Sequence, residues 1–256
     1  MGEGFDTNLV KTRYHLWSSR NMGFPTSPSL SHWGLGNKME TENNKKIILD
    51  LCGGTGSWSK PYKEAGYDVK VISLPIFDVL KTELVNGGAW FKGDDCNLYI
   101  PIENVAGILA APPCTHFAGS GAQYWKQKDL DGRTDEALAV VDMCLDIIGH
   151  FTPRWYAIEN PVGRLRRLRA ERLGEPKLIF NPCDYGDPYT KKTLVWGEFI
   201  LPTKNLVKPL PNDKQQNQIS MPTVNGKKIG WNTELAKELR SITPQGFAQA
   251  FFEANP

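Results

Sequence analysis

The feature that most constrains this 256-residue chain is an apolar run that ends at two prolines. Residues 105–111 have the length and composition of a buried strand. Pro112 and Pro113 stop that strand, because neither can donate a hydrogen bond to a neighbouring strand. Cys114 follows directly. The sequence therefore predicts a thiol on a rigid loop at the carboxyl end of a parallel strand, which is the edge where open α/β sheets bind ligands.

A second apolar strand, residues 47–51, leads into a glycine-rich turn and a helical pattern at 57–65. The glycines let the backbone approach a ligand closely, and the start of the helix offers unpaired N–H groups. The stretch D-L-C-G-G-T-G-S lacks the lysine of a phosphate-binding P-loop. It resembles motif I of S-adenosylmethionine-dependent methyltransferases instead.

Three further strands are predicted, at residues 67–74, 89–95 and 155–160. The last of them carries Glu159, and Pro161 ends it. A carboxyl at the end of a buried strand tends to have a raised pKa, which suits a proton donor. The alternative is a carboxylate that caps the following helix.

Two helices are predicted beyond these strands. Apolar residues at helical spacing across 133–150 indicate a core-facing helix, in which Cys144 is structural. The polar stretch 123–134 is expected to be a loop over the site. Residues 162–173 form a helix rich in arginine: Arg164, Arg166, Arg167, Arg169 and Arg172. Such a run is often a solvated face, but its density beside the predicted site favours contact with backbone phosphates.

Net charge, cysteine content and the length of the apolar runs limit the kinds of protein that this chain can be. The net charge is only +2, so any nucleic-acid contact needs a local basic patch. Five cysteines without a C-x-x-C motif indicate neither a disulfide framework nor a metal site. No run approaches the length of a membrane span. We expect a cytoplasmic protein, in the host cytoplasm if a phage encodes it.

Four parts are expected along the chain. Residues 1–44 would form an N-terminal arm, and residues 45–200 the catalytic domain. Residues 201–230 are rich in proline, asparagine and lysine and predict a small recognition or insertion region. Residues 231–256 would be a helical segment packed on the catalytic domain.

Several motifs occur in one order: D-L-C-G-G-T-G, P-P-C, E-N, Y-G-D-P-Y-T-K-K-T-L and R-S-I-T-P-Q-G-F-A-Q-A-F. Together they resemble the cytosine carbon-5 DNA methyltransferases, and the compact length is similar to members carried by phages and prophages. The resemblance implies an α/β, Rossmann-like fold with a mostly parallel seven-stranded sheet and helices on both faces. It also implies S-adenosylmethionine as cofactor and a flipped-out cytosine in DNA as substrate.

The resemblance assigns roles to individual residues. The implied catalytic residues are Cys114 as nucleophile, Glu159 at ring nitrogen 3, and Lys191 where the family has an arginine. The implied cofactor contacts are Asp50, Cys52, Gly53, Gly54, Gly56, Trp58, Ser73, Asp95 and Pro112. The predicted nucleic-acid contacts are Arg164, Arg166, Arg167, Arg169 and Lys192. The chain departs from the family at Ser73, where an acidic residue is usual, and at Thr193, which replaces a second arginine.

Two alternatives stay open. The same fold could act on RNA or on a free cytosine nucleotide, because the recognition region is short. The chain could also be a catalytically weak DNA-binding protein on a methyltransferase scaffold. An enzyme that methylates an exocyclic amine is disfavoured by Ala111 before the prolines and Cys114 after them.

Overall fold

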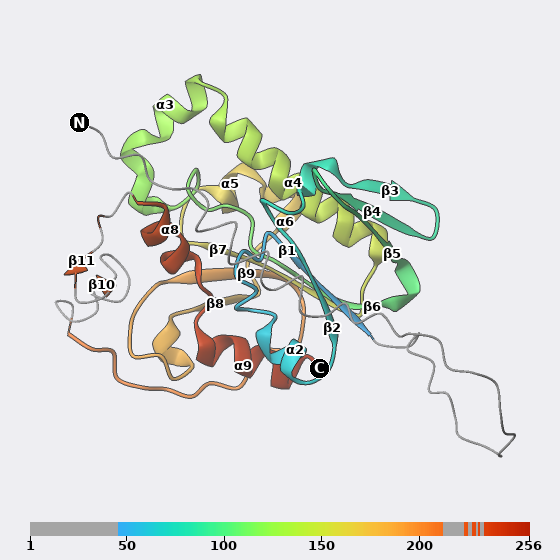
Figure 1. The fold of residues 1–256 in the computed structure, drawn as a ribbon. Helices are drawn as coiled ribbons and strands as arrows, with labels where there is room; N and C mark the ends of the chain where they lie inside the picture. Colours follow the sequence, from blue (N-terminus) through green and yellow to red (C-terminus); the bar gives the residue numbers. More distant parts are fainter. Residues whose placement is uncertain (1–45, 212–222, 225–226, 229, 231–232) are drawn as a thin grey trace, which may run out of the picture. The chain divides into compact units, whose positions relative to one another are not determined.

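A computed structural model describes residues 46–211, 223–224, 227–228, 230 and 233–256 (Figure 1). The predicted N-terminal arm and most of residues 212–232 lie outside this described part. The described residues all belong to one unit of the chain, Glu42–Pro256.

A six-stranded sheet organises the described residues, in the order β2-β1-β6-β7-β9-β8. Its strands are β1 (Ile47–Leu51), β2 (Asp68–Ile72), β6 (Val105–Ala110), β7 (Trp155–Pro161), β8 (Leu178–Phe180) and β9 (Thr193–Glu198). The first four run parallel to one another, while β9 is antiparallel to both β7 and β8. The predicted α/β class with a mainly parallel sheet is confirmed. The carboxyl ends of β1, β6 and β7 therefore lie at one edge.

Alternation along the strands sends side chains to two faces of the sheet. On one face, Leu49 and Ile108 join a core with Ile147 from α4 (Arg133–Phe151). On the other face, Ile48 and Leu109 pack with aromatic residues of α2 (Lys60–Glu64) and α9 (Gln245–Ala254). Figure 1 shows α4 on one side of the sheet and α2 and α9 on the other.

A separate three-stranded antiparallel sheet packs beside α4. It consists of β3 (Glu83–Val85), β4 (Gly88–Lys92) and β5 (Asn97–Pro101). The predicted strand at residues 89–95 is present as β4, but it belongs to this second sheet and not to the six-stranded one. Ala89 and Phe91 point into the same core as α4, and β4 pairs with β3 and β5 instead. The main sheet accordingly has six strands in the described part of the chain, where the resemblance implied seven.

The remaining described elements are short. They are α3 (Trp125–Leu130), α5 (Leu165–Leu168), α6 (Ala170–Leu173), β10 (Thr223–Val224), β11 (Lys227–Lys228) and α8 (Glu234–Ser241), with 3-10 turns at Val79–Lys81, Ile102–Asn104, Gly119–Tyr124 and Pro182–Asp184.

Two local predictions need correction. Residues 123–134 are not a loop, because α3 occupies half of them, a 3-10 turn precedes α3, and α4 begins at Arg133. The buried Lys128 side chain donates to the Thr115 carbonyl oxygen at 2.7 Å, which ties α3 to the segment after Cys114. The predicted helix 162–173 is two short helices, interrupted where Arg169 leaves helical dihedral angles.

Candidate active site

A pocket lies at the carboxyl ends of β1, β6 and β7. The predicted residues that line it are Asp50, Cys52, Gly53, Gly54, Trp58, Pro112, Cys114, Glu159 and Lys191. The predicted nucleophile Cys114, the predicted acid Glu159 and the glycine turn (residues 53–56), which are far apart in sequence, are thus brought together. Ala111, Pro113, Pro161, Ser241 and Thr243 complete the lining.

Asp50 is a buried carboxyl beneath this pocket. Strand alternation directs it to the same face of the sheet as Ile48, where the Ser59 hydroxyl donates to its Oδ2 at 2.5 Å. Its Oδ1 finds no hydrogen-bond partner within the described part of the chain. Burial raises the pKa of Asp50 to about 6, against the opposing effect of the Ser59 hydrogen bond. Such a group can accept a hydrogen bond from a ligand at the glycine turn.

The glycine turn requires its small residues. A β-carbon at Gly53 would overlap the Asp50 carboxyl group, so only glycine fits against that side chain. Gly54 has a φ of +55° and open space around it, a conformation that L side chains rarely adopt. Cys52, although not glycine, also has a φ of 56°. This strained backbone is typical of functional sites.

Ser73 stands beside this turn. Its hydroxyl accepts a hydrogen bond from the Gly54 N–H at 3.3 Å. The end of β2 therefore reaches the glycine turn, even though the acidic residue that is usual there is replaced.

Cys114, Glu159 and Lys191 influence one another electrostatically. Burial raises the pKa of Cys114, and the Glu159 charge raises it further, while Lys191 and Arg240 lower it. Burial also raises the pKa of Glu159, and Lys191 opposes that shift. The pocket thus holds a thiol, a carboxyl that retains its proton more readily than usual, and a cation.

Asn160 was not singled out by the sequence as a site residue. It is fully buried at the end of β7, and its side-chain amide donates to the Pro112 carbonyl oxygen at 3.0 Å. This contact fixes the proline pair that precedes Cys114. The E-N dipeptide at the end of a buried strand was the available signal, since a buried amide must find hydrogen-bond partners.

The C-terminal segment also contributes to the pocket in a way that local patterns could not predict. The Thr243 N–H donates to the Ser57 hydroxyl at 2.9 Å, and Lys191 Nζ donates to the Arg240 carbonyl oxygen at 2.8 Å. These hydrogen bonds attach the last turn of α8 to Lys191 and the segment after α8 to Ser57, which directly follows the glycine turn.

Asp95, a predicted cofactor contact, lies in the exposed turn between β4 and β5 and does not line the pocket. That turn lies beside the loop after β2. Gly93 is so close to the Ile76 carbonyl oxygen that a β-carbon there would overlap it. A contact between Asp95 and the cofactor stays a prediction.

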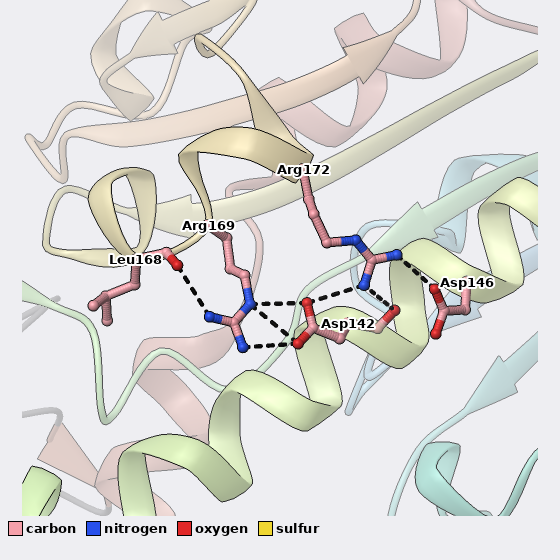
Figure 2. Close-up of polar contacts among 5 residues, drawn as sticks. All are labelled: Asp142, Asp146, Leu168, Arg169 and Arg172. Atoms are coloured by element: carbon pink, nitrogen blue, oxygen red, sulfur yellow. Dashed lines mark hydrogen bonds and ion pairs between the residues drawn. The ribbon is translucent and has the colours of Figure 1, made fainter.

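The arginine-rich segment after β7 is largely engaged within the protein. Figure 2 shows Arg169 and Arg172 reaching α4, where both contact Asp142 and where Arg172 also contacts Asp146. Arg164 is buried in contacts with α3. Arg166 and Arg167 are exposed, and Arg166 pairs with Glu175. Lys192 is exposed next to the pocket-lining Lys191.

No helix in the described part is long and apolar enough to cross a membrane. Within the same residues, no group of three or more histidine, cysteine, aspartate or glutamate side chains could hold a metal ion.

Comparisons with known proteins give two similarities. No family model matches the chain. The chain is 25% identical over 167 residues to the type II methyltransferase M.DdeI of Desulfomicrobium norvegicum, an alignment that covers 57% of this chain and 38% of that protein. The chain therefore spans well under half the length of this relative. A solved structure described as a DNA modification methyltransferase encoded within an E. coli prophage matches 66% of this chain and 56% of its own, with 17% identity and a TM-score of 0.38. Over more than half of its length the chain is similar in sequence to a type II methyltransferase, in agreement with the methyltransferase resemblance of its motifs.

Proposed function

We propose that this protein transfers a methyl group from S-adenosylmethionine to carbon 5 of cytosine in DNA, through a covalent adduct with Cys114. The observation that carries the proposal is the meeting of Cys114, Glu159 and Lys191 in one pocket with a glycine turn. All five cysteines of the chain carry free thiols. Free thiols fit a reducing compartment, and we propose the cytoplasm.

The residues at the glycine turn fit the proposed cofactor. Asp50 offers a buried oxygen that has no hydrogen-bond partner among the residues described, and Gly54 has open space beside it. Asp50, the turn and Trp58 would hold the cofactor, with Ser73 and Asp95 proposed as further contacts. When bound, S-adenosylmethionine supplies a methyl group on a positively charged sulfur, which makes that methyl electrophilic.

The side chains of this pocket suit an addition and elimination at cytosine. The Cys114 sulfur forms a bond to carbon 6, and the electrons of the double bond between carbons 5 and 6 become available at carbon 5. Glu159 donates a proton or hydrogen bond to ring nitrogen 3, and Lys191 supplies positive charge beside it. After methyl transfer a base removes the proton from carbon 5, and the bond between sulfur and carbon 6 breaks.

DNA is the proposed substrate because exposed basic residues follow pocket-lining residues closely in sequence: Arg166 and Arg167 come shortly after Pro161, and Lys192 comes directly after Lys191. Arg166, Arg167 and Lys192 can contact phosphates. A cytosine in duplex DNA must leave the base stack to reach such a pocket.

The test is incubation with labelled S-adenosylmethionine and DNA, RNA or cytosine nucleotides, followed by nucleoside analysis. We expect 5-methylcytosine in DNA only. Cys114→Ser should reduce turnover at least about 1000-fold, and Glu159→Gln about 100-fold or more, while the exposed-cysteine variant Cys96→Ser should behave as wild type.

Trapping gives a second, independent readout. DNA with 5-fluorocytosine should accumulate as a covalent adduct on wild type, because fluorine replaces the proton that elimination needs. Methylation without any adduct, or full activity in Cys114→Ser, would reject the covalent mechanism. Label on RNA or nucleotides alone would reject the DNA substrate.

A further inference from the structure

The backbone on both sides of Cys114 is held by side chains from one short segment that follows Glu159. Before Cys114, the Pro112 carbonyl oxygen accepts from Asn160 at 3.0 Å. After Cys114, the His116 carbonyl oxygen accepts from Arg164 Nε at 2.9 Å. Both donors are buried, with Arg164 only 5% exposed. The segment that carries the acid therefore also holds the loop that carries the thiol.

Backbone pairing brings these two segments together. Ala118 and Gly163 form an antiparallel bridge. The Gly119 N–H donates to the Val162 carbonyl oxygen at 3.0 Å, and the Arg164 N–H donates to the Phe117 carbonyl oxygen at 2.9 Å. A β-carbon at Gly163 would overlap the Phe117 carbonyl oxygen, so the close approach depends on glycine.

Beyond its contact with His116, the guanidinium of Arg164 also contacts α3 and the start of α4. Its Nη1 donates to both oxygens of Asp129, at 2.7 and 2.9 Å, and its Nη2 donates to the Thr134 hydroxyl at 2.8 Å. The Trp125 ring lies 4.9 Å from the guanidinium carbon. A buried cation needs such partners, and these contacts leave Arg164 unsuited to the phosphate role that the sequence favoured.

We propose that Arg164 is a positioning residue, which holds the Cys114 loop in line with Glu159 through the His116 carbonyl and anchors that loop to α3. The inference rests on the proposed methyl transfer. It explains why the charged Arg164, three residues after the end of β7, is buried rather than exposed like Arg166 and Arg167. Alignment of a nucleophile matters steeply, since a displacement of about 1 Å can cost about 100-fold in rate.

The first test is Arg164→Lys, which keeps the charge but cannot make the forked contacts to His116, Asp129 and Thr134 together. We expect kcat to fall about 100-fold, with the KM values for DNA and cofactor close to wild type. The matched control is Arg154→Lys, an exposed arginine before β7, which should keep wild-type kcat.

A second readout does not depend on turnover. Iodoacetamide labelling, mapped by mass spectrometry, should modify Cys114 several-fold faster in Arg164→Lys than in wild type, because the loosened loop exposes the thiol. Cys144 is fully buried in the core and serves as an internal control that should stay protected. Faster labelling together with slower catalysis would separate misalignment from a loss of thiol reactivity.

If Arg164→Lys also exposes Cys144, global unfolding accounts for its effect. The variant Asp129→Asn then tests the positioning role instead. That variant weakens the anchor to α3 and leaves the His116 hydrogen bond, so smaller changes in the same directions are expected. Wild-type kcat and wild-type Cys114 labelling in a folded variant would overturn the inference. If wild type transfers no methyl group at all, the proposed function fails, whereas the labelling contrast between Cys114 and Cys144 still tests the positioning role.

Discussion

Cys114 and Glu159 each make the charged state of the other less favourable. The pKa of the thiol is raised by burial and then by the negative charge on Glu159, while Lys191 acts in the opposite direction. A proton on Glu159 therefore favours the thiolate. This coupling suits a reaction in which the thiol must lose a proton while the carboxyl provides one.

Replacement of Glu159 by glutamine should lower the pKa of Cys114, because it removes a neighbouring negative charge. The pH profile of Cys114 alkylation should then move to lower pH, since more thiolate is present at any given pH below the midpoint. Lys191→Met removes a positive charge and should move the profile to higher pH. Rates of iodoacetamide labelling across a pH series measure both shifts.

The control for this pair is Glu175→Gln, an exposed carboxyl in the loop after α6. It should leave the alkylation profile unchanged. A profile for Glu159→Gln that stays in place or moves to higher pH would contradict the electrostatic coupling.

At the scale of elements, the segment after β7 divides its arginines between two roles. The interruption between α5 and α6 lets Arg169 and Arg172 turn toward α4, where Asp142 accepts hydrogen bonds from both (Figure 2). Arg166 and Arg167 stay on the exposed side. A continuous helix would have placed the arginines around its surface without this division.

Two sets of variants should separate these roles. Arg166→Ala with Arg167→Ala should reduce the slope of log affinity for DNA against log salt by roughly 2, because two phosphate contacts are lost. Asp142→Asn should leave that slope near wild type and lower the free energy of unfolding by on the order of 1 kcal/mol, since its contacts are partly screened. Salt titrations and urea denaturation measure the two quantities.

Asp146→Asn is the matched control for stability, because Asp146 is half-exposed and contacts only Arg172 among the residues of this network. Its effect should be smaller than that of Asp142→Asn. An unchanged salt slope in the double arginine variant would mean that Arg166 and Arg167 are solvated surface residues that do not contact phosphates.

At the scale of the whole molecule, α9 packs against a residue that lines the pocket. Phe247 of α9 is fully buried, stacks on Phe180 at 4.0 Å and lies 5.8 Å from the Trp58 ring that lines the pocket. The Tyr62 hydroxyl donates to the Asn255 carbonyl oxygen at 2.7 Å. The sheet face that carries Asp50 is thus covered by residues nearly two hundred positions later in sequence.

Phe247→Ala should lower the free energy of unfolding by about 3–5 kcal/mol, as large buried aromatic side chains do when they are truncated. Phe252→Ala, a partly exposed neighbour on the same helix, should cost clearly less. Urea denaturation of both variants provides the comparison. Equal losses would mean that α9 does not form the described core contact with Trp58 and Phe180.

The sequence by itself determined the parts that depend on local pattern. Apolar runs ended by proline or glycine predicted β1, β6 and β7, because a buried strand needs continuous apolar residues and proline cannot extend the hydrogen-bond ladder. The motifs that follow those strands predicted the glycine turn, Cys114 and Glu159 as one site, because parallel strands present their carboxyl ends at one edge.

Only the tertiary structure decided how those parts are supported. The placement of β4 outside the main sheet depends on its pairing with β3 and β5, and short apolar runs do not encode a pairing partner. The burial of Arg164 depends on Asp129 and Thr134, which local sequence cannot bring together with it. An exposed arginine and a buried, paired one have the same local pattern, and the difference in desolvation arises only when distant segments pack.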